Sequence, residues 1–394
     1  MISENSSLHI QNLANNSEGL TILTLIIIVT ILLSLFFWIF YTLDKQYRNC
    51  TKMETYLKKY SDYKSHDYIK TDPNFKIEST DSSYKHHIRN YYIKTAYNAC
   101  CGGGYKNNFV NLCSLKTFIQ MGAKCLHLQI FNVNGEPVVA ASTSKNNTIK
   151  ETYNHLGLDS VFGNIVNENN KLGSIPDPLF LFLDVKSNLI DTYIKLYDKI
   201  MYHFDRKNKL CEKTNAFNKD LSEGFLKLEM YEFKENNDYK GKIFLIIKPA
   251  DNNISYIQKT YLRTVVDFIP DYSPEDPTME PPLKLYYYSD IVAKGSQNAI
   301  LIDGTKQSLV IVLPDIDSRA HNYDPTICFD NGCQFIAMKF QFPNDTNLIN
   351  YCKAFKNKQN KNLMLKPTSL INEIPNSQRY DSRNAGISSI EGGF

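Results

Sequence analysis

Charge is absent from one long stretch near the start of the chain. Between Gly19 and Leu43 there is no Asp, Glu, Lys, Arg or His. A helix needs about 20 apolar residues to cross a bilayer, so this run is long enough. A cleaved signal peptide fits less well, because the run is long, no Lys or Arg precedes it and no small-residue cleavage site follows. The sequence predicts a transmembrane helix over residues 20–43.

Basic residues are missing before this run and frequent after it. The short tail formed by residues 1–19 contains no Lys or Arg. The basic residues that follow the run are Lys45, Arg48, Lys52, Lys58 and Lys59. Because cytoplasmic flanks are enriched in Lys and Arg, we expect the N-terminus outside and the long C-terminal part in the cytoplasm. The lipid bilayer is then one partner of the chain.

The sequence also lacks a strong net charge and a regular cysteine pattern. Its 394 residues carry a net charge of +3, which gives no general case for nucleic-acid binding. The nine cysteines are odd in number and spaced neither as a disulfide framework nor as a zinc site. We therefore expect reduced, partly buried thiols in the cytosol. Hydrophobic residues make up 43% of the chain, which suits a globular core.

Beyond the membrane run, residues 44–82 are polar and predict a stalk. A helix is expected over residues 112–122, a strand over 125–131, a turn over 132–135 and a strand over 136–141. His127 and Gln129 leave one face of the first strand, since side chains alternate along a strand. The preceding glycines at 102–104 are not followed by Lys-Ser/Thr, so a plain loop is favoured over a phosphate-binding loop.

Strands and helices alternate through the next part of the chain. Residues 150–156 and 191–204 predict helices, while 178–186 and 241–248 are apolar, as buried parallel strands are. This alternation favours a parallel sheet. The segment 251–282 breaks the pattern, and its later part is acidic and rich in proline. We expect it to be a disordered linker that is dispensable for folding.

The last third carries three motifs in a fixed order. They are His321-Asn322-Tyr323-Asp324-Pro325, then Phe329-Asp330-Asn331-Gly332-Cys333-Gln334-Phe335-Ile336-Ala337-Met338-Lys339-Phe340-Gln341, then Leu365-Lys366-Pro367. Together with the earlier strands they resemble the phosphoinositide-specific phospholipase C family over about residues 83–370. The resemblance implies an α/β fold, a distorted (β/α)8 TIM-type barrel split by the acidic linker and preceded by one transmembrane helix. Its expected parts are an X-like half at 83–250, the linker at 251–282, a Y-like half at 283–370 and a flexible tail at 371–394.

The residues that carry catalysis in this family are mostly replaced here. Tyr97 and Ala141 stand at the positions of the two catalytic histidines. Tyrosine has an ordinary pKa near 10 and alanine has no proton to move, so the general acid–base pair is lost. The nearby His86 and His87 are the candidates for a rebuilt site.

The calcium site implied by the resemblance is also altered. Its four positions are occupied by Asn98, His127, Gln129 and Asp184, which bring one carboxylate and one nitrogen ligand that Ca²⁺ disfavours. Lys186 lies two residues after Asp184 and could replace the ion's charge. We therefore expect no calcium cofactor, and His127 is favoured as a packed barrel residue over a ligand.

Most of the positions that hold the phosphorylated head group in the family are also replaced by other residues. Lys248 matches one of two phosphate-binding lysines, whereas Ile246 replaces the other. Ile311 and Leu313 replace an arginine and a tyrosine, and apolar side chains cannot bind phosphate as arginine does.

Three functions remain open at this stage. The leading hypothesis is a membrane-anchored, phospholipase C-like protein that has lost catalysis and acts as a scaffold for an unknown protein partner. One alternative is an active phosphatidylinositol 4,5-bisphosphate phosphodiesterase in lipid signalling, with a rebuilt site. The other alternative is a module that binds a phosphoinositide head group without turnover.

Overall fold

Parallel strands form the centre of the molecule. They follow the order β6 (Ile243–Lys248), β5 (Leu179–Val185), β2 (Cys125–Val133), β1 (Tyr91–Ala96), β9 (Phe335–Met338), β8 (Leu309–Leu313) and β7 (Leu283–Tyr287), each parallel to its neighbour. Because β1 pairs with both β2 and β9, the first and last parts of the domain share one sheet. The parallel sheet and the α/β class predicted from the sequence are confirmed.

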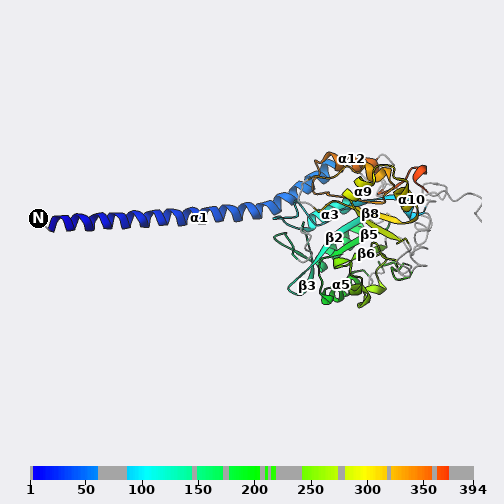
Figure 1. The fold of residues 1–394 in the computed structure, drawn as a ribbon, viewed down its shortest axis with the longest axis horizontal. Coiled ribbons are helices and arrows are strands. Elements are labelled where there is room, and N and C mark those ends of the chain that lie inside the picture. The colour runs from blue at the N-terminus through cyan, green and yellow to red at the C-terminus, as the bar shows by residue number, and fades with distance from the viewer. Residues whose placement is uncertain are drawn as a thin grey trace, which may run out of the picture.

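The computed structural model shows a long helix projecting from a rounded α/β body (Figure 1). The residues it describes are 3–60, 87–143, 149–171, 177–204, 209–211, 214–218, 242–273, 280–316, 321–356 and 362–371. All but the first residue of the predicted flexible tail, the end of the predicted stalk and His86 lie outside these ranges.

The sheet curls into a barrel that is closed by residues 266–271. Phe268 forms a parallel bridge with Ile246 of β6, and its carbonyl accepts a hydrogen bond from the Ile247 amide at 3.0 Å. On the other side, the Asp271 amide donates to the carbonyl of Leu283 in β7 at 2.8 Å. This segment therefore takes the place of a strand between β6 and β7.

The prediction of a disordered linker is wrong for the first part of residues 251–282. The segment contains α8 (Ser255–Gln258) and a 3-10 helix over Tyr261–Thr264, and it buries Ile257, Leu262, Val266 and Phe268. Its apolar residues are too irregularly spaced to show a helix or strand period, although they fill the gap in the barrel. Residues 274–279, where acidic and proline residues concentrate, lie outside the described ranges.

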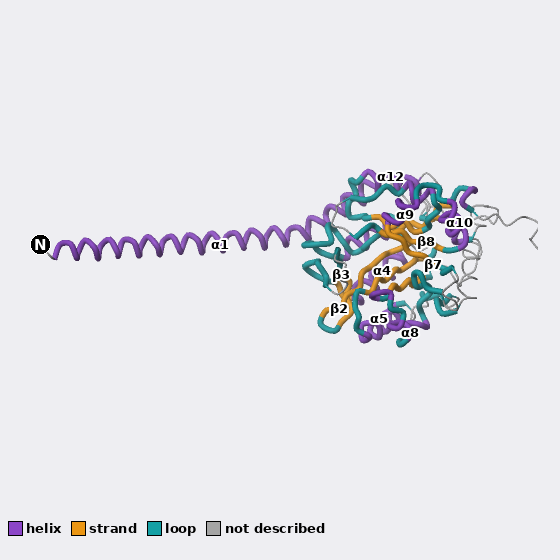
Figure 2. The backbone as a smooth tube through the Cα atoms, viewed as in Figure 1, coloured by secondary structure: helices purple, strands orange, loops and turns teal. Residues whose placement is uncertain are grey.

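Helices cover the outside of the barrel (Figure 2). The longer ones are α3 (Leu112–Gln120), α4 (Leu158–Lys171), α5 (Ile190–His203), α10 (Ala299–Gln307) and α12 (Thr346–Lys356), with the short α9 (Tyr288–Lys294) and α11 (Thr326–Asp330). The predicted helices at 112–122 and 191–204 are confirmed. The helix predicted at 150–156 is wrong, because that stretch pairs its backbone with Ala141 and then enters β4 (Leu156–Gly157).

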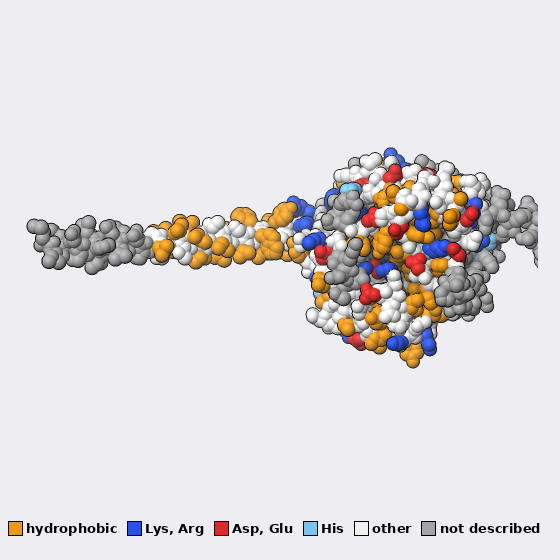
Figure 3. Space-filling model, viewed as in Figure 1, with side chains coloured by type: hydrophobic (Ala, Val, Ile, Leu, Met, Phe, Trp, Pro, Cys, Tyr) orange, Lys and Arg blue, Asp and Glu red, His pale blue; other side chains and the backbone are white. Residues whose placement is uncertain are grey.

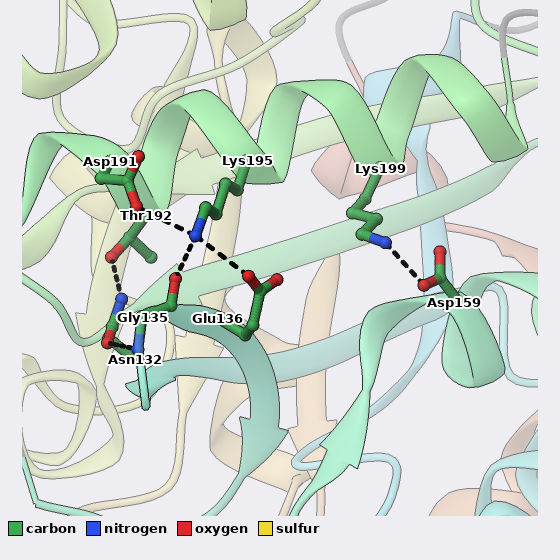
Figure 4. Close-up of polar contacts among 8 residues, drawn as sticks. All are labelled: Asn132, Gly135, Glu136, Asp159, Asp191, Thr192, Lys195 and Lys199. Carbon is green, nitrogen blue, oxygen red and sulfur yellow. Dashed lines mark hydrogen bonds and ion pairs between the residues drawn. The ribbon is translucent and has the colours of Figure 1, made fainter.

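The antiparallel additions are β3 (Glu136–Ala140) and β4 on the edge of β2, and β10 (Leu363–Leu365) beside β1. The β2–β3 turn needs positive φ at Asn134 and Gly135, with values of 54° and 81°. Lys195 of α5 donates to the Gly135 carbonyl at 2.7 Å and pairs with Glu136 at 3.0 Å (Figure 4). Asn132 donates to Thr192 at 2.9 Å, so the tip of the hairpin is fixed to the first turns of α5.

The N-terminal helix α1 (Ser3–Tyr60) continues well past the predicted membrane span. Residues 44–60, predicted as the start of a polar stalk, extend this helix, and Met53 is buried at 1% exposure against the barrel. Cys50 and Cys113 form a disulfide, which corrects the expectation that all nine cysteines are reduced. The two cysteines are 63 residues apart. Only the packing of α1 on α3 brings them together, so their spacing gave no signal.

Gln334, within the longest of the three motifs, joins several elements of the barrel. The Gln334 side chain accepts from the Val310 amide at 2.9 Å and donates to the carbonyls of Arg89 and Thr305 at 2.7 and 2.8 Å. These bonds join β9, β8, the chain before β1 and α10 at one buried point. A buried amide with both ends satisfied fixes the relative position of these elements.

Candidate functional site

A row of polar side chains lies where three neighbouring strands end. In register, Gln129 of β2 pairs with Asp184 of β5, and Asp184 pairs with Lys248 of β6. Residues paired in register point to the same side of a sheet. The carboxyl ends of parallel strands form one rim, where the binding residues of α/β barrels lie. We call this rim, with the loops that follow the strands, the barrel mouth.

Asp184 is held between two lysines. Its Oδ2 lies 2.8 Å from Lys186 Nζ and its Oδ1 lies 3.3 Å from Lys248 Nζ. The side chains of Asp184 and Lys186 are almost fully buried, and that of Lys248 is 14% exposed. Both carboxylate oxygens therefore face ammonium groups, and the cluster of three residues has one net positive charge.

The charges in this cluster stabilise one another. Burial alone would raise the pKa of Asp184, but Lys186, Lys248 and His127 outweigh it and hold that pKa well below its usual range. Burial alone would lower the pKa of Lys248, but Asp184 outweighs it and raises that pKa above its ordinary value. Asp184 is thus ionised, and Lys248 protonated, at neutral pH.

His127 is placed as a neutral, packed side chain. Its Nδ1 accepts a hydrogen bond from the Asn98 amide at 3.3 Å, so the proton lies on Nε2, which is 3.8 Å from Asp184 Oδ2. Burial lowers the pKa of His127, Asp184 opposes this shift, and the two lysines add to it. With one nitrogen accepting and the other protonated, His127 has no free lone pair to take a proton from a substrate.

Tyr97 and Ala141, the positions where the resemblance led us to expect catalytic histidines, are both buried. Tyr97 stacks on His127 with ring centroids 4.6 Å apart and meets Tyr105 edge-on at 5.7 Å, so it packs within the mouth. Ala141 is fully buried, and its carbonyl accepts hydrogen bonds from the amides of Glu151 and Thr152 at 2.9 and 3.3 Å. The chain at 151–152 therefore covers the second position.

The residues present do not fit a calcium ion. Both Asp184 oxygens already face lysines, and Gln129 Oε1 accepts from the Ser142 amide at 2.9 Å. His127 offers only nitrogen, and Ca²⁺ binds through oxygen ligands. Among the residues that the structure describes, no group of three or more His, Cys, Asp or Glu is placed to hold a metal ion.

The remaining predicted positions divide between the mouth and the core. Ile246, Ile311 and Leu313 are buried in strands β6 and β8. Lys248, predicted as a possible head-group contact, is charged and lies at the mouth. His87 comes directly before a 3-10 helix that leads into the amino end of β1, so it lies at the end of the barrel opposite the mouth.

Two neutral residues lie near the mouth: Asn98, which is one of the four calcium positions implied by the resemblance, and Gln341, which the sequence did not single out. The side-chain amides of Asn98 and Gln341 are buried, and neither forms a hydrogen bond within the described part of the chain. Asn98 follows β1, and Gln341 follows the adjacent β9. Asn98 also has a positive φ of 46°, which is uncommon for a residue other than glycine. Gln341 ends the longest motif, whose length drew attention to the fold rather than to any one side chain.

Comparison with known proteins supports the assignment of this chain to the α/β barrels. No family model and no curated protein matches the chain. The crystal structures of PLC21 from L. pealei and from S. officinalis each match with a TM-score of 0.56 and 16% identity, covering 73% of this chain and 38% of theirs. A calcium-dependent phosphoinositol-specific phospholipase C from Pseudomonas sp. matches with a TM-score of 0.46 and 12% identity, over 72% of this chain and 97% of that one.

The barrel has the fold of the phosphoinositide-specific phospholipases C. The chain spans well under half the length of the PLC21 structures it matches. The chain shares this fold, and one helix in the part that the structure describes is long and apolar enough to cross a membrane.

Proposed function

We propose that this chain is a membrane-anchored, phospholipase C-like protein that does not hydrolyse phosphoinositides and acts as a scaffold or interaction module. The observation that supports it best is the ion pairing of Asp184 with Lys186 and Lys248, where the fold family has calcium. Phosphodiester cleavage needs both proton transfer and neutralisation of developing charge. Among the described residues of the strand-end row there is no acid–base pair, and its carboxylate, Asp184, is already paired with two ammonium groups.

Turnover of phosphatidylinositol 4,5-bisphosphate in vesicles by the full-length protein tests the proposal. We expect no release of inositol phosphate above a heat-denatured sample, with or without calcium. Each missing acid–base group accounts for roughly 10²–10⁴-fold in rate. Calcium-stimulated release would overturn the proposal and leave the fold unaffected.

Restoring the two histidines is not expected to restore activity. A Tyr97→His/Ala141→His variant regains the family's proton-transfer groups, but the ion that would stabilise the phosphate is still excluded by the lysines. The same vesicle assay should show no calcium-stimulated turnover. A Tyr97→Phe/Ala141→Ser variant is the matched control for packing changes. Activity in the histidine variant alone would show that calcium can enter the mouth beside Lys186 and Lys248.

One observation favours binding without turnover as a second function. The Asp184 cluster keeps one net positive charge, and Lys248 remains partly exposed. An ammonium at the mouth can bind a phosphate group without a metal. Binding of the full-length protein's barrel to soluble inositol phosphates would separate this function from a pure scaffold. A Lys248→Met variant should lose that binding, whereas a Lys259→Met variant on the exposed surface should keep it.

We also propose that α1 crosses the membrane with its N-terminus outside and the barrel in the cytoplasm. The Lys and Arg residues after the span support this orientation. The cysteines outside the disulfide are all buried, as cytosolic thiols often are. The Cys50–Cys113 bond argues against it, because disulfides are rare in the cytosol.

Glycosylation mapping decides the orientation. Asn253 is exposed and begins the acceptor sequence Asn253-Ile254-Ser255. We expect no glycan there in cells, because a cytoplasmic barrel never meets the glycosylation machinery. An Asn253→Gln variant should then migrate like the native chain on a gel. A glycan that disappears in this variant would place the barrel on the other side of the membrane.

A further inference from the structure

The helix that carries the membrane span is joined to the barrel through several independent contacts. Lys45 Nζ donates to the Asn107 carbonyl at 3.0 Å, and Asn49 Nδ2 donates to Asn108 Oδ1 at 2.9 Å. The next residue, Cys50, is bonded to Cys113, and Met53, about one turn further on, is buried. We call these contacts the α1 joint.

A glycine lets the helix approach the barrel this closely. A Cβ at Gly102 would lie 3.0 Å from Asn49 Cβ and 2.4 Å from Asn111 Nδ2. Asn111 is not free to move aside without loss, because its Oδ1 caps α3 by accepting from the Ser114 amide at 2.8 Å. The close packing of the α1 joint is therefore built into the loop beneath it.

The α1 joint lies at the mouth end of the barrel. Its barrel side is the loop 97–111 together with the first turn of α3, and this loop starts at the carboxyl end of β1. Figure 1 shows α1 reaching the body on the side where the β2–β3 hairpin lies, at the carboxyl end of β2. Helix α10 lies on the opposite side of the body (Figure 1).

The spacing along α1 places the mouth close to the lipid. Exposed apolar side chains cover α1 from Leu20 to Leu43, and Lys45 follows two residues later. At 1.5 Å per residue, the first contact with the loop lies only about 3 Å beyond the apolar run. The head-group layer on each side of a bilayer is roughly 5–8 Å thick. Figure 3 shows Lys and Arg side chains gathered where the apolar part of the helix meets the body, as suits this layer.

The loops at the mouth also present apolar side chains to solvent. Ile149 is 67% exposed in the loop after β3, Leu189 is 57% exposed after β5, and Ile316 is 37% exposed after β8. These side chains come from different strand ends, so they surround the mouth rather than mark one patch. Contact with lipid would remove them from water.

We propose that the α1 joint holds the barrel with its mouth against the surface of the bilayer that α1 crosses. The occupant of this face is the head-group layer of that membrane, in contact with the Leu189 loop. The inference rests on the membrane anchoring proposed above. A rigid joint fixes the direction of the mouth relative to the membrane, whereas a flexible stalk would let the barrel rotate.

Tryptophan quenching in vesicles tests the direction of the mouth. The only tryptophan, Trp38, is first replaced by Phe in the full-length chain. A Leu189→Trp variant then reports the mouth, and an Ile300→Trp variant, at a site on α10 that is 85% exposed, is the matched control. Vesicles contain phosphatidylcholine and phosphatidylserine, with a fraction of lipids brominated near the head group. We expect the Trp at 189 to lose more than half its fluorescence and the Trp at 300 to lose none.

In a variant that breaks the α1 joint, the mouth should no longer be held against the bilayer surface. Cys50→Ser combined with Met53→Asp removes the disulfide and places a charge in a buried contact. Quenching of the Trp at 189 should then fall toward the value of the control.

Vesicle flotation separates the two ways of failing. If the native protein does not float with vesicles, the anchor is wrong, and this inference is wrong with it. If it floats but the tryptophans at 189 and 300 are quenched equally, the anchor stands and the mouth does not face the membrane.

Discussion

An Asp184→Asn variant is expected to lose about 3–5 kcal/mol of unfolding free energy, the usual cost of breaking a buried ion pair from one side. The substitution keeps the size of the side chain but leaves the ammonium groups of Lys186 and Lys248 buried beside each other without a counter-charge. Urea unfolding of the detergent-solubilised protein, followed by circular dichroism, measures the loss.

The matched control is Asp191→Asn, the same substitution in an exposed pair with Lys195. Exposed ion pairs contribute at most about 1 kcal/mol, so this variant should unfold near the wild type. Equal losses in the two variants would contradict the structural role assigned to Asp184.

The pH dependence of the Asp184 effect follows from the direction of its pKa shift. The folded pKa lies below the unfolded value of about 3.9, so the stabilisation is fully present above about pH 4. It is lost as pH falls through the lower, folded pKa. The difference between the wild type and Asp184→Asn should therefore be constant from neutral pH to about pH 5 and shrink only in stronger acid. A difference that disappears near pH 6 would point to His127 instead.

A Phe268→Ala variant is expected to cost about 3–5 kcal/mol of unfolding free energy, as large-to-small changes of buried aromatic residues do. Phe268 is 2% exposed and lies in the segment that closes the barrel between β6 and β7. The same urea experiment measures it. Tyr261→Ala, at a 70% exposed position of the same segment, should cost about 1 kcal/mol or less. Equal, small losses would mean that residues 251–272 are a dispensable linker after all.

The barrel could be predicted because local sequence patterns indicate most of its strands and helices. The β5 residues Leu179–Val185 are apolar except for Asp184, and all seven are buried, as in a strand covered on both faces. The α5 pattern and the turn at Asn134-Gly135 are similarly local signals. The motif around Gln334 was informative because its amide joins four elements, which restricts the residues allowed there.

The closing segment and the α1 joint could not be predicted for the opposite reason. Phe268 acts as a strand residue through one bridge, to Ile246, and no alternating pattern surrounds it. Cys50 meets Cys113 only after α1 packs on α3. Such contacts depend on tertiary placement, which overrides local propensity.

The candidate site was predictable in position but not in its bonding. Strand register follows from the fold and places Gln129, Asp184 and Lys248 in one row. The sequence suggested that Lys186 could replace an ion's charge. It did not suggest that Lys248 would pair with the same carboxylate, because that contact depends on side-chain direction across two strands.

If two lysines stand in the place of a calcium ion, the full-length protein should not bind calcium at the mouth. Isothermal titration of the detergent-solubilised protein measures this binding. Even weak protein calcium sites bind at about 10⁻⁴–10⁻³ M, which sets the range to titrate. We expect no saturable binding at the mouth over this range. One calcium ion per chain, bound by the wild type and lost in Asp184→Asn, would contradict this expectation.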